Sequence, residues 1–218
     1  MLSDKKGNCR ILSLCFVIFF KKMRIFLNLI FICIGSLFLH SQANTPILTA
    51  IRPPYLILDD GKDSLKLKGL EAASTQLIFM LFHAEQDVIG LDPGLSNDGR
   101  WRAIHLKEIL KNVEFEKYFS TPFRNNILTL EPLTNWRKAE LSLYDQADLK
   151  SLFKQLDLLA PDDLVMMIHQ QTFAQIMRHL ISSDYTETFV EQPTDVIYIL
   201  ERKVGQPGKL HKFKYKIR

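Results

Sequence analysis

Residues 76–87 read QLIFMLFHAEQD, and in this stretch six consecutive apolar residues run directly into a histidine, an alanine and a glutamate. An apolar run of this length is typical of a parallel strand that is covered on both faces of its sheet. A buried strand usually ends in a turn residue, so a titratable side chain at that point needs a chemical reason. His83 is therefore the first candidate functional residue of the chain.

A second apolar run, LVMMI at 164–168, also ends on a histidine, His169. Ligands of open parallel sheets bind at the carboxyl ends of the strands. We therefore expect His83 and His169 to face each other across one pocket. A single histidine in such a place is more often hydrogen-bonded scaffolding than a catalyst, but the matching positions of two histidines leave the structural and the functional interpretation equally open.

The rest of the chain alternates between strand and helix patterns, which predicts an α/β fold. We expect a three-layer α/β/α sandwich with a mostly parallel central sheet, because alternating elements place helices on both sheet faces. Ser96 is expected to cap a helix that turns Trp101, Ile104, Ile109 and Leu110 inward. Residues 62–74 have a partly helical pattern, and the runs at 195–200 and 210–217 predict a hairpin at one edge of the sheet.

The first 43 residues have the pattern of a targeting segment. Lys21, Lys22 and Arg24 precede an apolar run at 25–39, and Ser41-Gln42-Ala43 has the small-x-small pattern of a signal peptidase site. We expect cleavage near Ala43–Asn44 and export to a periplasmic or secreted location. Met23 is a candidate true start. The alternative is an uncleaved segment that anchors the protein in a membrane. The chain then divides into a targeting segment (1–43), a lead-in (44–75) and the main domain (76–218).

Charge and cysteines gather in the same segment. The chain has a formal net charge of +4, but residues 1–43 hold six of its 28 basic and one of its 24 acidic residues, so the remainder is near −1. The excess of basic residues therefore belongs to the predicted targeting segment, and it does not indicate a nucleic-acid partner for the main domain. All three cysteines also lie in this segment, which excludes a disulfide framework and a cysteine metal site in the main domain. We expect no metal and no cofactor, and contact with a membrane only through the N-terminal segment if it stays uncleaved.

Four stretches resemble the histidine phosphatase superfamily, whose fold is that of phosphoglycerate mutase. They are LIFMLFHAEQD, DPGLSNDGRWRAIHLKEIL, YFSTPFRNNILTLEPL and LVMMIHQQTFAQIMRHL, within residues 76–181. The resemblance implies that His83 attacks phosphorus and becomes a phosphohistidine. His169 and two arginines would hold the phosphoryl oxygens, and a carboxylate, for which Glu85 is the nearest candidate, would protonate the leaving group. The partner would be a small phosphorylated molecule or a phosphoprotein.

The sequence departs from the family pattern at the phosphate clamp. Phe82 stands where the first arginine is expected, and Asn125 stands where the second is expected. Arg124 precedes that position by one residue, which is about 100° around a helix. We name Arg124 and Asn125 as the candidate phosphate-binding residues, with Arg124 as a displaced clamp. A further departure is Ile168, which replaces the usual glycine before the second histidine.

Two functions follow from this mixture of retained and lost residues. One is phosphomonoester hydrolysis through a phosphohistidine, since both histidines are present. The other is a catalytically inactive pseudophosphatase that binds a ligand or a protein, because a phosphate would meet two imidazoles and no fixed cation. Glu131 and Glu140 are alternative general acids to Glu85, and no spacing distinguishes the three carboxylates.

Overall fold

The computed structural model describes residues 45–71, 74–181, 184–187, 192–203, 206 and 208–216. The targeting segment predicted at 1–43 lies outside these described residues. Residues 45–218 form one compact unit. Within the described part of the chain, no helix is both long enough and apolar enough to cross a bilayer.

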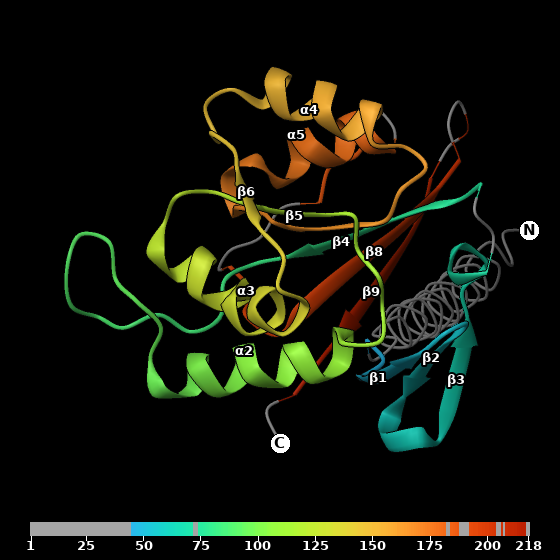
Figure 1. The fold of residues 1–218 in the computed structure, drawn as a ribbon, viewed down its shortest axis with the longest axis horizontal. Helices are drawn as coiled ribbons and strands as arrows, with labels where there is room; N and C mark the ends of the chain where they lie inside the picture. The colour runs from blue at the N-terminus through green and yellow to red at the C-terminus, as the bar shows by residue number, and fades with distance from the viewer. Residues whose placement is uncertain are drawn as a thin grey trace, which may run out of the picture. The chain divides into compact units, whose positions relative to one another are not determined.

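A six-stranded sheet forms the centre of the unit, with the strand order β6-β5-β7-β4-β8-β9 (Figure 1). Its strands are β4 (Gln76–Leu81), β5 (Lys117–Ser120), β6 (Leu141–Leu143), β7 (Leu164–Met167), β8 (Val196–Arg202) and β9 (Lys209–Lys214). The first four strands are mutually parallel, while β8 is antiparallel to both β4 and β9. The predicted hairpin at the sheet edge is confirmed.

Helices cover both faces of this sheet, as predicted (Figure 1). They are α2 (Asn97–Leu110), α3 (Arg124–Arg137), α4 (Leu149–Leu158) and α5 (Gln170–Leu180). Successive side chains of a strand point to opposite faces, so Phe79 packs in one core with α2 and α3, and Met80 in another with α4 and α5. The three-layer α/β/α sandwich is therefore the observed architecture.

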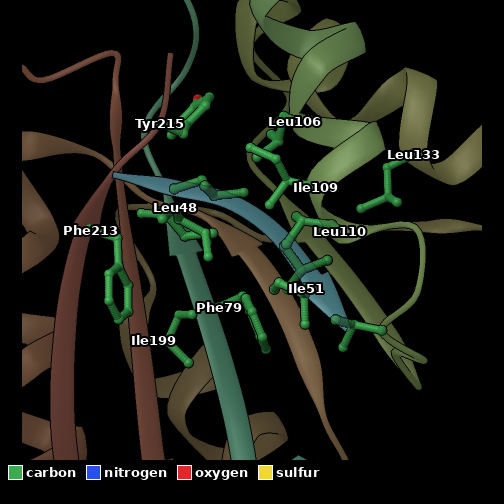
Figure 2. Packing of buried hydrophobic residues seen from close by; sticks show 14 of the residues in the cluster. Leu48, Ile51, Phe79, Leu106, Ile109, Leu110, Leu133, Ile199, Phe213 and Tyr215 are labelled. Atoms are coloured by element: carbon green, nitrogen blue, oxygen red, sulfur yellow. The ribbon is translucent and has the colours of Figure 1, made fainter. Parts of the chain in front are cut away.

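The lead-in adds a small antiparallel sheet to the α2 side of the unit. It consists of β1 (Leu48–Arg52), β2 (Tyr55–Leu58) and β3 (Asp63–Lys66). Leu48 and Ile51 are fully buried and share the core with Phe79 and Ile109 (Figure 2). The partly helical pattern expected within 62–74 does not hold for Asp63–Lys66, which pairs with β2; the described residues that follow form the short 3-10 turn Lys68–Leu70, and residues 72 and 73 lie outside the described part of the chain.

Helix α2 begins as expected but presents a different face to the core. Ser96 caps it by accepting a hydrogen bond from Gly99 N. The prediction that Trp101 and Ile104 point inward is wrong, since these side chains are 61% and 42% exposed. A Cβ at position 99 would lie 2.0 Å from the carbonyl oxygen of Glu85, so the helix rests on that backbone through Gly99. This contact turns the opposite side of the first turns toward solvent.

We predict that replacing Ile51 with alanine lowers the free energy of unfolding by about 2–4 kcal/mol, because the side chain is fully buried in the main core. The matched control is Ile104→Ala, which shortens an exposed side chain and should cost below ~1 kcal/mol. Urea unfolding followed by circular dichroism measures both values. Equal effects of the two substitutions would show that β1 does not belong to the core.

Candidate active site

His83 and His169 extend two neighbouring strands from matching positions. β4 and β7 pair in parallel with Leu81 opposite Met167, so the chain reaches each histidine two residues beyond that pair. Ile168 N donates a hydrogen bond to Leu81 O at 2.7 Å and extends the pairing of the two strands to their C-terminal ends. Both histidines line one cleft of about 570 Å³, whose other lining residues are Gln86, Leu91, Asp92, Pro93, Phe123, Asn125, Gln146, Ala147, Gln171 and Thr172.

The ring of His83 is oriented by its own backbone neighbour. Its Nδ1 lies 2.7 Å from Ala84 O, and a carbonyl oxygen can only accept a hydrogen bond. Nδ1 therefore carries a proton, and Nε2 of the neutral ring keeps its lone pair. An imidazole in this tautomer is arranged to attack an electrophile through Nε2.

The segment that carries His83 is fixed by groups from α2 and α3. Ala84 N donates to Thr129 Oγ1 at 3.0 Å, and Thr129 Oγ1 donates to Asn125 O at 2.7 Å. Ser96 N donates to Glu85 O at 2.9 Å. Thr129 and Ser96 thus hold the backbone on either side of the carbonyl group that orients His83.

His169 is held by two polar side chains beneath the cleft. Its Nε2 lies 2.9 Å from Asn126 Nδ2 and 2.9 Å from Thr121 Oγ1. Because the Asn126 amide nitrogen can only donate, Nε2 accepts, and the proton of the neutral ring lies on Nδ1. Burial, together with the charge that His83 can carry, lowers the pKa of His169 to about 4. His169 is therefore a neutral imidazole at neutral pH.

Glu85 belongs to an ion pair that is not part of the cleft lining. Arg102 Nε donates to both of its carboxylate oxygens at 2.8 Å, Arg102 Nη2 also donates to it, and Thr194 Oγ1 lies 3.2 Å from Oε1. Burial acts to raise the pKa of Glu85, but the hydrogen bond and charge of Arg102 outweigh it and hold the pKa below its ordinary value. A carboxylate in this state is a poor proton donor, so the position of Glu85 does not favour the predicted role of general acid.

Phe82, at the position of the first clamp arginine, is part of the hydrophobic core. Its side chain is 1% exposed, and its ring centroid lies 5.7 Å from that of Phe173 and 6.4 Å from that of Tyr198. A guanidinium group at this position would be buried among aromatic rings, where an unpaired charge is strongly unfavourable.

At the second clamp position the structure brings Asn125, but not Arg124, to the cleft. Asn125 Nδ2 donates to Gln86 Oε1 at 2.9 Å, and both residues line the cleft. Arg124 lines a separate groove, and a Cβ at Gly94 would lie 3.5 Å from its Nε. Arg124 does not line the cleft in this arrangement, because adjacent helical residues face directions about 100° apart, and its role as a displaced clamp stays a prediction.

The cleft consequently combines two imidazole rings with a lining that offers no positive side chain to a phosphate. Among the described residues that line it, none is lysine or arginine, and the charged side chain is the carboxylate of Asp92. Asp92 Oδ1 accepts a hydrogen bond from Arg124 N at 3.0 Å and so caps α3 from outside. Within the part of the chain that the structure describes, no group of three or more His, Cys, Asp or Glu side chains could hold a metal ion.

Sequence reasoning missed several residues of the cleft. Thr121 and Asn126, which hold His169, lie five residues apart around the start of α3, and this spacing was the available signal. Gln171 and Thr172 follow the second histidine in the sequence and line the cleft because α5 begins there. Gln146 lies in the loop after β6, and no feature of the sequence connects it to the site.

Comparison with solved structures agrees with the fold described above. The protein histidine phosphatase SixA complexed with tungstate is 16% identical and has a TM-score of 0.54, and the match covers 63% of this chain and 96% of that chain. A mycobacterial glucosyl-3-phosphoglycerate phosphatase is 13% identical with a TM-score of 0.52 and coverages of 65% and 100%. This chain has the histidine phosphatase fold.

A third solved structure adds a further phosphatase to the comparison. The phosphoserine phosphatase of Entamoeba histolytica, in complex with 3-phosphoglyceric acid, is 12% identical with a TM-score of 0.50 and coverages of 65% and 98%. No family model and no curated protein matches the sequence. At these identities the likeness establishes the fold, and the activity must be argued from the residues of the cleft.

We predict that His169 makes the fold less stable as the pH falls from about 6.5 to about 4. In this window the unfolded chain binds a proton at His169 that the folded chain does not, so the free energy of unfolding decreases. Urea unfolding at pH 7 and pH 4.5 should show a smaller difference for His169→Gln than for the wild type. A titration of the His169 ring by NMR with a midpoint near 6.5 would contradict this prediction.

Proposed function

We propose that this protein is a histidine-phosphatase-like protein whose cleft binds a small polar ligand with little or no phosphoryl transfer. The observation that carries the proposal is the charge of the cleft. His83, His169 and Asn125 meet there, but the lining described above contains no cation. Amide and hydroxyl groups from Gln86, Gln146, Gln171 and Thr172 offer hydrogen bonds to an uncharged polar ligand.

The argument against efficient phosphoryl transfer is electrostatic. Phosphoryl transfer relies on cations that stabilise the charge on the equatorial oxygens. Arginine does this through a planar fork that meets two oxygens at once. Each lost hydrogen bond to a charged group removes roughly 1.5–3 kcal/mol of binding. Two lost arginine contacts therefore reduce turnover by several orders of magnitude.

The second candidate function is a slow phosphomonoesterase that forms a phosphohistidine. It is favoured by the hydrogen bond from His83 Nδ1 to Ala84 O, which leaves Nε2 free to attack. In this case the substrate would be a small phosphorylated molecule or a phosphoprotein. The two candidates share the site and differ in whether bound phosphate reacts.

We predict that Asn125→Arg increases the affinity of the cleft for phosphate by roughly tenfold or more, because it places a guanidinium group at the cleft face of α3. Wild-type protein should bind inorganic phosphate weakly and show negligible hydrolysis of p-nitrophenyl phosphate. Isothermal titration calorimetry and a release assay measure these two quantities.

The matched control is Asn135→Arg, which adds the same charge to an exposed position of the same helix. It should leave phosphate binding unchanged. Hydrolysis of p-nitrophenyl phosphate by the wild-type protein that disappears in His83→Ala would overturn the proposal of an inactive protein and support the slow phosphomonoesterase. Turnover that survives His83→Ala would contradict both candidates.

We also propose that the protein is exported and that its targeting segment is removed near Ala43–Asn44. The support is the sequence order of Lys21 and Lys22, the apolar run at 25–39 and the small-x-small site. A periplasmic or secreted location follows if cleavage occurs, and a membrane-anchored protein follows if it does not.

We predict that the protein recovered from cells begins near Asn44. Mass spectrometry of the intact protein gives the start, and fractionation gives the compartment. Leu29→Arg, which places a charge in the apolar run, should block export. Recovery of wild-type protein at full length with the membrane fraction after a high-salt wash would support the anchor instead.

A further inference from the structure

A second concave site lies between the N-terminal parts of α2 and α3, outside the histidine cleft. This groove has a volume of about 290 Å³. Its lining residues are Leu95, Arg100, Ala103, Ile104, Arg124, Leu128, Glu131 and Pro132. Neither histidine of the candidate active site belongs to this lining, and Arg124 faces the groove while its neighbour Asn125 faces the cleft.

Helical spacing explains how the walls of the groove are built. Arg100, Ala103 and Ile104 are three and four residues apart on α2, so they share one helix face. Arg124, Leu128 and Glu131 share a face of α3 in the same way. α2 and α3 both follow parallel strands of the sheet and run in the same direction, which brings Arg100 and Arg124 to the same end of the groove.

The two arginines lack the acidic partners that exposed arginines often have. In the described part of the chain, neither Arg100 nor Arg124 forms a salt bridge. Arg100 Nε donates to Leu95 O at 3.3 Å, and no described group accepts a hydrogen bond from the side chain of Arg124. Two guanidinium groups thus line one small groove, and neither is within salt-bridge distance of a described carboxylate, although Asp92 accepts a hydrogen bond from Arg124 N and Glu131 lies farther along the groove.

The positions of these arginines also cost helix stability. Arg124 is the first residue of α3 and Arg100 the fourth residue of α2. Cations are unfavourable at helix N-termini, because the helix dipole is positive there. A charge arrangement that works against the local fold is expected where a ligand compensates for it.

The remaining walls of the groove are mostly apolar. Leu95 and Ala103 are buried at its floor, and Ile104 is 42% exposed at its rim. Glu131 lies seven residues beyond Arg124, about 10.5 Å along the helix axis. One end of the groove is therefore cationic, its middle is apolar, and its far end carries a carboxylate.

We propose that this groove binds a free amphiphile with a single acidic head group. The guanidinium groups of Arg100 and Arg124 hold a carboxylate or a phosphate, both of which match their planar forks. An unbranched aliphatic tail lies along Ile104 and Leu128. Glu131 at the far end disfavours a second acidic group on the tail, so a monocarboxylate is preferred over a dicarboxylate of equal length.

The direct test uses octanoate and octyl phosphate as probes of the two head groups. Isothermal titration calorimetry at low ionic strength should detect binding of at least one of them. Acetate, which lacks the tail, and octan-1-ol, which lacks the charge, should each bind at least about tenfold more weakly. Octanedioate should bind more weakly than octanoate. Amide NMR shifts should change most at the lining residues of the groove.

Variants assign the binding to the arginines and to the apolar wall. Arg100→Gln combined with Arg124→Gln should weaken the binding of the better probe by roughly tenfold or more. Arg52→Gln and Arg178→Gln remove exposed arginines outside the groove and are the matched controls. Ile104→Ala should weaken octanoate but not acetate. Circular dichroism verifies that each variant is folded.

Three results would overturn the proposal. The first is the absence of binding by both octanoate and octyl phosphate, and the second is unchanged affinity in the folded double arginine variant. The third is binding only to phosphatidylglycerol vesicles and to neither free probe, which would identify a membrane-contact surface instead. Because the histidines do not line the groove, these results are independent of phosphate binding and turnover in the cleft.

Discussion

The parallel register between β4 and β7 is the constraint on which the candidate active site depends. Leu81 lies opposite Met167, so both strands end at the same level, and His83 and His169 lie together at the C-terminal ends of the two strands. A shift of one residue would turn one histidine toward the opposite face, because side chains alternate along a strand. The two apolar strand interiors, fully buried on both faces, fix this register.

Residues outside the cleft maintain the geometry of His83. Gly99 allows α2 to approach the backbone of Glu85, and Thr129 of α3 accepts the hydrogen bond from Ala84 N. Both residues belong to the stretches of sequence that resemble the family motifs, and in the structure they fix the backbone next to His83. The backbone around His83 is therefore held independently of which side chains line the cleft.

The two positions at which the family pattern has arginines, Phe82 and Asn125, differ in how they are packed. Phe82 packs in the core beside Phe173 and Tyr198. An arginine at this position would therefore disturb the core on the α5 side of the sheet. At the second position, the neutral side chain of Asn125 lines the cleft, while the charged side chain of Arg124 lines the groove between α2 and α3. The first turn of α3 thus separates a polar cleft without lysine or arginine in its described lining from a groove that is lined by two arginines.

The layer architecture, the approximate positions of the sheet strands and the placement of two histidines at strand ends could be predicted before folding was considered, because apolar runs and helical periods are local properties of the chain. The sequence could also show that Arg124 precedes the expected arginine position by one residue and so faces another direction, since helical geometry is local too. The ion pair of Glu85 with Arg102, the contacts of Asn126 and Thr121 with His169, and the exposure of Trp101 could not be predicted in this way. These outcomes depend on which elements come together, and side chains far apart in the sequence meet only when helices and sheet have packed.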